Sequence, residues 1–431
     1  MLSFEPLLFN VYGLSSVADR SFCHVCKVAV SGYNGKVRIK YAQFICQGWE
    51  ALESGGANSI DWIKDMSNVK QGRESNVELL RILAAAGVVV LHYNNKDMGG
   101  AFAVVQPGSR TDLLLNLLEC FFICAVNLFV LITGFYMYRN PKRDLLKPLS
   151  LFWQVILFSV GAYLITAAVN GESFSGPRFL NSFLPTNWFV TLYAVLYVIS
   201  PFLNASFQNL SEKGRQRGIL ILLMIFSLWP TLADEYMGWR HSTPPGIQPI
   251  SMLSTEAGYS IVNFCLLYLL GCFLRVNVAK EKNLKIGWLG LALVINVLLI
   301  FAWTQFDAKH GISSAGWDYC NPLIISEAVL LFLFFRKINL GVRPWINEFS
   351  KATFTVYIFH EHVIRYVQAQ KYVQISARAT LIHLFLVVVG ILLASFIIYE
   401  IYNFLMKPLM NFISKRWRRW RFLVVNGIVK W

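Results

Sequence analysis

Charged residues are scarce in this 431-residue chain: Asp, Glu, Lys and Arg together make up 15% of it, while 56% is hydrophobic. A soluble protein of this length cannot bury that much apolar surface, whereas side chains that face lipid need no polar partner. The scarcity of charge therefore excludes an ordinary soluble protein. It favours an all-α protein that crosses a membrane several times.

A disulfide framework and a signal peptide are missing as well. The eight cysteines lack the spacing of a secreted scaffold, and Cys23 and Cys26 form one C-x-x-C without the second pair of a zinc ribbon. Glu5 interrupts the short apolar run at the N-terminus, and no basic segment precedes it. We therefore expect no metal site, no tightly bound cofactor and no cleaved leader.

Apolar runs of roughly the 20 residues that a helix needs to span a bilayer recur along the chain. We count ten of them and predict a polytopic bundle of about ten transmembrane helices. The runs are 76–95, 113–138, 147–169, 188–207, 218–233, 258–274, 286–306, 322–335, 352–370 and 380–406.

Basic residues between these runs predict the orientation. Starting with the flank before the first run, every second gap is richer in Lys and Arg than the gap that follows it. Because basic residues are retained in cytoplasmic loops, the alternation predicts that both ends of the chain are cytoplasmic. The net charge of +15 is spread over these short gaps. We therefore expect a membrane-lipid environment and no nucleic-acid partner.

The two ends of the chain differ from the bundle. Residues 1–65 are not apolar enough to span, and Met66 opens a short polar lead into the first run. We interpret 1–65 as an N-terminal extension outside the natural fold and 66–408 as the transmembrane domain. In the tail 409–431, Arg residues mix with Trp, Phe and Val. This composition predicts a segment lying on the inner leaflet, with a merely solvated basic tail as the alternative.

Three ionisable residues share one face of the first predicted helix. At 100° per residue, Glu78, Arg81 and His92 fall within a single stripe, and Arg81 lies about 16 Å from His92 along the axis. The predicted orientation puts Arg81 near the cytoplasmic end and His92 towards the outer end. A guanidinium suits a phosphate or carboxylate, and an imidazole suits proton transfer near neutral pH.

The alternative is that Glu78 and Arg81 merely pair three residues apart while His92 lies at the membrane interface. Other ionisable residues within apolar runs argue against it, because each is costly at membrane depth. Glu119 lies in the second run, Glu327 in the eighth, and His360 opens a polar group in the ninth. Together they predict a polar cavity inside the bundle.

Four segments resemble the acyltransferase-3 family of membrane O-acyltransferases, in order over residues 73–406. They are NVELLRILAAAGVVVLH at 76–92, VNLFVLITGFYMYR at 126–139, NWFVTLYAVLYVISPFLN at 187–204 and FTVYIFHEHVIR at 354–365. The first carries an Arg and a His with ten residues between them, the family's spacing. The second has Thr133 where the family has Ser, which is a modest departure.

The resemblance implies that an acyl group, usually acetyl from acetyl-CoA, passes to a hydroxyl of an extracytoplasmic or lipid-linked glycan. Arg81, Arg139 and Arg143 would then hold the phosphates of cytoplasmic acyl-CoA. His92 would act as base or carry the acyl group, with Glu78 orienting Arg81. We add from predicted depth alone that Glu119 orients His92. His360 is a second acid–base or positioning candidate, with a structural core histidine as the alternative.

Two other classes fit part of the pattern. A transporter or flippase for a lipid-linked glycan would also contain buried charges, but no repeat relates 73–240 to 258–406. A scaffold subunit would need no stripe of Glu, Arg and His. The acyltransferase interpretation places the protein in a bacterial inner membrane, with acyl-CoA and a glycan acceptor as its partners.

Overall fold

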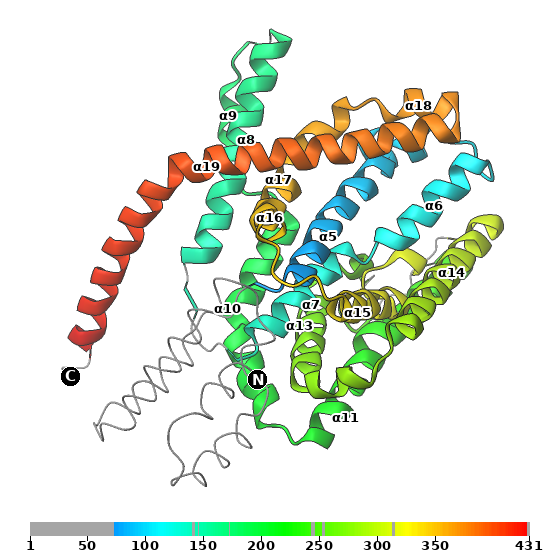
Figure 1. Cartoon of the computed structure of the whole chain (residues 1–431). Coiled ribbons are helices and arrows are strands. Elements are labelled where there is room, and N and C mark those ends of the chain that lie inside the picture. The colour runs from blue at the N-terminus through cyan, green and yellow to red at the C-terminus, as the bar shows by residue number, and fades with distance from the viewer. Residues whose placement is uncertain are drawn as a thin grey trace, which may run out of the picture. The chain divides into compact units, whose positions relative to one another are not determined.

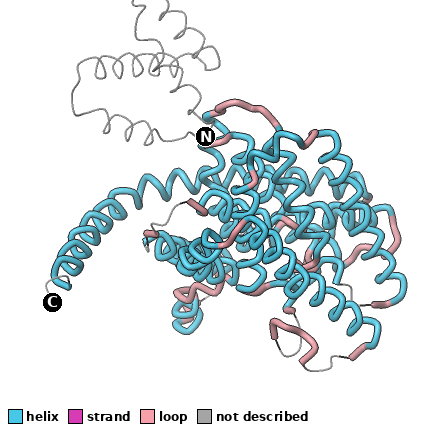
Figure 2. Tube along the Cα trace, turned by 90° about the horizontal axis from the view of Figure 1, so that it is seen from below, coloured by secondary structure: helices cyan, strands magenta, loops and turns pink. Residues whose placement is uncertain are grey.

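The computed structural model describes residues 73–139, 143–144, 146–171, 173–242, 246–251, 255–312 and 315–428. These residues form helices joined by loops, and no strand occurs among them, which confirms the predicted all-α class (Figures 1 and 2). The predicted extension at 1–65 and the predicted start at Met66 lie outside the described residues.

The helices follow one another in chain order and include several short ones. The longer helices are α5 (Ser75–Asn94), α6 (Arg110–Phe122), α7 (Ala125–Met137), α8 (Leu146–Asn170), α10 (Trp188–Asn209), α11 (Glu212–Leu223), α12 (Trp229–Arg240), α13 (Ile261–Val276), α14 (Ile286–His310), α15 (Pro322–Lys337), α17 (Thr353–Val363) and α19 (Ala377–Ile428). The shorter ones are α9 (Gly176–Asn181), α16 (Pro344–Phe349) and α18 (Ala369–Ile375).

Eight spans among the described residues are long and apolar enough to cross a membrane. Three of them contain an interruption: α6 and α7 adjoin at residues 123–124, α11 continues through a π-helical turn, Met224–Leu228, into α12, and residues 318–321 separate a 3-10 turn, Ala315–Trp317, from α15. They are Ser75–Asn94, Arg110–Met137, Leu146–Asn170, Trp188–Gln208, Glu212–Arg240, Ile286–His310, Ala315–Lys337 and Ala377–Met406. The protein is therefore a multi-pass membrane protein.

Two of the ten predicted spans differ. The sixth is the shorter apolar helix α13, and the ninth is divided into α17, a 3-10 turn (Ile364–Tyr366) and α18. The division lies at Gln368, whose φ of 55° is left-handed and cannot continue an α-helix. The count of ten and the cytoplasmic placement of both ends stay predictions. The predicted tail boundary at 408 falls inside α19, which continues to Ile428.

The spans differ in how much of their apolar surface is packed inside the bundle and how much is exposed. In the span formed by α6 and α7, 72% of the apolar window is buried, against 6% in α8 and 17% in α19. Glycines bring α7 and α13 together: a Cβ at Gly134 would overlap the backbone oxygen of Tyr268, and one at Gly271 would overlap that of Leu131. Close backbone approach through small residues is typical of helix packing in membranes.

Hydrogen bonds between helices hold the same region. Asn204 of α10 donates to the backbone oxygen of Met137 (3.0 Å) and accepts from the Tyr268 hydroxyl of α13 (2.9 Å). Asn127 of α7 donates to the backbone oxygen of Tyr319 (2.8 Å). These bonds fix the register of the helices around α5, which contacts α6, α7, α15, α16, α17 and α19.

Candidate functional site

Helix α5 carries the predicted stripe on one continuous element. Glu78 lies in its first turn, where a carboxylate suits the helix dipole, and no proline interrupts the 20 residues. The Ser75 hydroxyl donates to the side-chain oxygen of Asn347 (2.9 Å), which ties the start of α5 to α16. The helix ends at Asn94, two residues beyond His92. Arg81 and His92 therefore stand at opposite ends of one rigid helix.

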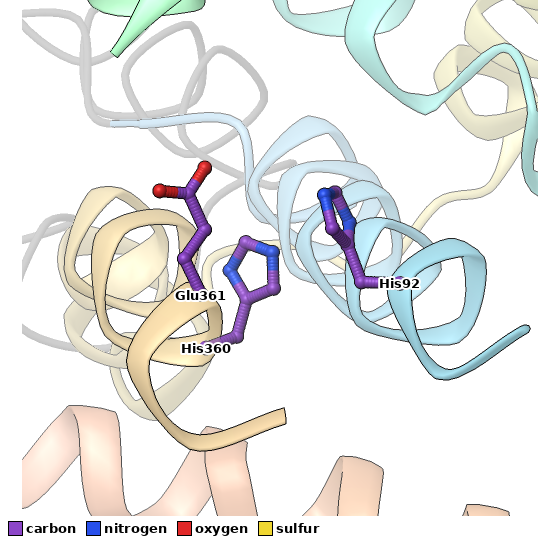
Figure 3. A group of neighbouring side chains, drawn as sticks. All are labelled: His92, His360 and Glu361. Atoms are coloured by element: carbon purple, nitrogen blue, oxygen red, sulfur yellow. The ribbon is translucent and has the colours of Figure 1, made fainter. Parts of the chain in front are cut away.

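At one end, His92 of α5 meets His360 of α17. Their ring centroids are 4.6 Å apart with an interplanar angle of 72°, and Figure 3 shows the two rings side by side. His92 is half-buried and His360 is fully buried. The structure thus brings together two histidines that lie 268 positions apart in the chain.

Each of these rings is held by a carbonyl of its own helix. Nδ1 of His92 lies 2.9 Å from the backbone oxygen of Val88, and Nδ1 of His360 lies 3.0 Å from that of Val356. A carbonyl oxygen only accepts, so each Nδ1 carries a proton, and in its neutral form each ring has its lone pair on Nε2. Nε2 of His360 is buried without a hydrogen-bond partner.

Glu361 completes this end of the site. Its carboxylate, His92 and His360 each offer one donor atom that lies within 4.8 Å of the other two. Asn187, which caps the start of α10, donates to Oε1 of Glu361 (3.1 Å) and accepts from the Tyr357 hydroxyl (3.3 Å). We call His92, His360, Glu361, Asn187 and Tyr357 the histidine end.

Glu119 lies on α6 and accepts a hydrogen bond from the Asn94 side chain (2.8 Å). Asn94 is two residues beyond His92 on α5. No described contact joins Glu119 to His92 itself. The predicted orientation of His92 by Glu119 would therefore have to pass through Asn94.

The other end of α5 is a network of arginines, glutamates and aromatic rings. Glu78 lies 3.5 Å from Arg81 and 3.6 Å from Arg73, and its side chain is 7% exposed. The guanidinium of Arg81 lies 6.0 Å from the ring centroid of Tyr136, whose hydroxyl donates to Glu74 (2.6 Å). The predicted pairing of Glu78 with Arg81 is present, and Glu78 also forms an ion pair with Arg73.

Two further arginines join this network from α13 and α15. Arg336 pairs with Glu74 (2.8 Å) and with Glu281 (2.9 Å). The guanidinium groups of Arg275 and Arg336 lie 5.1 Å and 4.6 Å from the ring centroid of Phe135. We call the whole network the arginine end; its members are Arg73, Glu74, Glu78, Arg81, Phe135, Tyr136, Arg275, Glu281 and Arg336.

The remaining predicted arginines follow α7. Arg139 is exposed, and its charge repels that of Arg275. Arg143 donates to the Ser200 hydroxyl (2.8 Å) and lies 5.7 Å from the ring centroid of Tyr197, both on α10. Arg139 therefore adds charge to the arginine end, while Arg143 packs against α10.

Several residues of the site were missed in the sequence. Arg275 and Arg336 were counted only as loop charges, although each directly follows an apolar run, where a long side chain can reach back into the bundle. The sequence indicates one role for Asn187, because an Asn directly before the apolar run that begins at Trp188 is typical of a helix N-cap. Its bond to Glu361 joins positions 174 apart and could not be read from local pattern.

Comparison with known proteins gave one match. A family model described as an acyltransferase domain matches residues 74–400, which include both ends of α5 and reach into α19. No curated protein and no solved structure matches the chain.

Proposed function

Because the chain belongs to the acyltransferase-3 family, we propose that it moves an acyl group from cytoplasmic acyl-CoA to a hydroxyl of an extracytoplasmic or lipid-linked glycan. Membership makes the protein a membrane enzyme that transfers acyl groups. Acetyl as the acyl group, the glycan acceptor and a bacterial inner membrane are parts of the proposal.

One observation carries the proposal: α5 holds an imidazole, with its Nδ1 proton on a carbonyl oxygen, at one end and a cluster of arginines about 16 Å away at the other. Acyl-CoA is anionic at its phosphates and reactive at its distant thioester. The arginine end suits the phosphates, because guanidinium groups bind them through strong charged hydrogen bonds. The histidine end suits the thioester and the acceptor hydroxyl.

In this mechanism His92 acts as the base. Its Nδ1 proton is held by the Val88 carbonyl, so Nε2 is free to accept the proton of the acceptor hydroxyl. The hydroxyl oxygen attacks the thioester carbon, the carbon–sulfur bond breaks, and the departing thiolate takes the proton from His92. An acyl group carried briefly on Nε2 is the alternative route.

The neighbouring groups support these roles. His360 packs edge-on against His92 and would fix the orientation of its ring, or take part in acid–base work. At the arginine end, Arg81, Arg139 and Arg275 would hold donor phosphates, with Arg143 on the adjoining α10 surface. Glu78 keeps Arg81 in place by pairing with it.

A labelling experiment tests the proposal. Membranes that contain the protein, and matched membranes without it, are incubated with acetyl-CoA labelled in the acetyl group. We expect label in a glycan fraction only when the protein is present, with release of one free thiol per acetyl group transferred. Mass spectrometry of the labelled glycan identifies the acceptor.

A transporter remains the second candidate because the ninth predicted helix is broken between α17 and α18, as helices at transporter binding sites often are. If glycan export depends on the protein while acyl-CoA is never consumed, the transporter function replaces the proposed one.

A further inference from the structure

We propose that His92, His360 and Glu361 form a binding site for a divalent cation of the zinc class. One donor atom from each lies within 4.8 Å of the other two, and the three residues come from two helices, α5 and α17. In Figure 3 the His360 ring stands between the His92 ring on the side of α5 and the Glu361 carboxylate on the side of α17.

The lone pairs of both rings are available to a cation. Both Nδ1 atoms donate to carbonyl oxygens, so the neutral forms of His92 and His360 each present a lone pair on Nε2. A carboxylate is the third acceptor. Nε2 of His360 is buried with no partner, which is costly unless something electron-poor binds there. Three acceptors that lie this close together are suited to a cation.

The three side chains are already held by their neighbours as metal ligands usually are. A metal-bound histidine commonly donates its other ring N–H to a carbonyl or carboxylate, as both rings do here. Asn187 binds Oε1 of Glu361 and leaves Oε2 for an ion. Arg365, one turn further on, acts on Glu361 only through its charge, since no described hydrogen bond or ion pair joins them.

The donor set selects the type of ion. Two imidazoles and one carboxylate with a fourth position open form a common zinc set, whereas calcium and magnesium prefer oxygen ligands alone. Tetrahedral zinc with ligands at about 2.0–2.1 Å places its donor atoms roughly 3.3 Å apart. Closing from 4.8 Å to that separation requires a shift of up to about 1.5 Å, which the half-buried His92 and Glu361 side chains can make.

An ion at this site would occupy Nε2 of His92, the atom that the proposed mechanism uses as base. Binding of zinc and deprotonation of an acceptor by the same nitrogen exclude one another. This consequence for activity rests on the proposed function, whereas binding of the ion does not.

The test measures zinc on the full-length protein in detergent, with Cys23 and Cys26 both replaced by Ser to remove the other candidate ligands. After chelator treatment and equilibration with Zn²⁺, we expect one zinc per chain by elemental analysis and by calorimetry. His360→Ala and Glu361→Gln should abolish stoichiometric binding, and Asn187→Ala should weaken it about 10–100-fold.

His310→Ala is the matched control. His310 also holds Nδ1 on the carbonyl oxygen four residues earlier (2.7 Å from Phe306), but it is exposed and belongs to no described three-ligand group. This variant should bind zinc as the parent does. A lack of zinc on the parent, or unchanged stoichiometry in His360→Ala, overturns the proposal.

X-ray absorption at the zinc edge provides a readout that needs no variant. We expect a first coordination shell of nitrogen and oxygen with two imidazoles, whereas sulfur ligands would overturn the assignment. Neither measurement involves acyl transfer, so a failure of the metal site is distinct from a failure of the proposed function.

Discussion

The two ends of α5 differ in how their polar side chains are paired and how far they are exposed. At the arginine end, charges are paired in part and remain accessible: the side chain of Arg81 is 28% exposed and that of Glu74 is 35% exposed. At the histidine end, the two rings hold their Nδ1 protons on carbonyl oxygens, and His360 is fully buried. The arginine end therefore keeps some of its charges accessible to water, whereas the histidine end buries the ring of His360 completely.

This difference indicates a division of labour along one helix. A multiply charged ligand is bound best where permanent charges can stay solvated in its absence, because a buried charge is costly. A base works best where its lone pair is not already occupied by water or a fixed proton. The comparison therefore separates residues that should affect donor affinity from residues that should affect turnover.

The largest effect is expected from His92→Ala. Loss of a general base should lower kcat for acyl transfer about 10²–10⁴-fold while acyl-CoA still binds. Steady-state kinetics with purified protein measures it. His310→Ala, the matched exposed histidine, should leave kcat unchanged. Equal activity of the His92 variant and the parent protein would remove His92 from the mechanism.

Variants of the arginine end should change the KM for acyl-CoA rather than kcat. Removing a charged hydrogen bond costs about 1.5–3 kcal/mol, so Arg81→Gln should raise the KM for acyl-CoA roughly 10–100-fold with a much smaller change in kcat. Arg275→Gln should act in the same direction without unpairing a carboxylate, since no described ion pair holds Arg275. Arg110→Gln, exposed at the start of α6, is the control.

Both ends of α5 depend on a rigid arrangement of the surrounding helices. The close contact between α7 and α13 supports that arrangement. Gly134→Ala should lower the free energy of unfolding by about 1–3 kcal/mol, because the added methyl group overlaps the Tyr268 backbone. Gly161→Ala in α8 meets nothing within 4 Å and should not destabilise the protein. Unfolding in detergent measures both, and equal stability of the two variants would show that the helices can separate.

The smallest effect is expected from Glu119→Gln. A glutamine can still accept the hydrogen bond from Asn94, so we expect kcat to change less than about threefold. A loss well beyond tenfold would mean that the negative charge of Glu119 acts on His92 after all. Steady-state kinetics of the Glu119→Gln variant and the parent protein distinguishes these two outcomes.

Helix periodicity and hydropathy predicted much of this structure. The stripe on α5 was predictable because it depends only on residues within 15 positions of one another. The ninth helix was not, because its apolar content favoured a span while a single left-handed residue, Gln368, divides it. Similarly, depth alone predicted that Glu119 would meet His92, whereas rotation about the helix axis directs it to Asn94.

The histidine end shows the same limit. His360 stood out as an ionisable residue in an apolar run, but its contact with His92 depends on the packing of α17 against α5. The local sequence does not mark Asn187 or Arg275 as site residues, because their contacts at the site are with residues far away along the chain. Tertiary contacts between distant helices leave no local pattern.

Labelling in sealed vesicles of known orientation tests the central claim most directly, namely that α5 joins a cytoplasmic donor site to an acceptor site on the opposite face. Labelled acetyl-CoA, which does not cross the membrane, is added outside vesicles that expose either the cytoplasmic or the outer face. We expect glycan labelling only when the cytoplasmic face is exposed, with the label on the sealed, opposite side. Equal labelling when only the outer face meets acetyl-CoA would contradict the account.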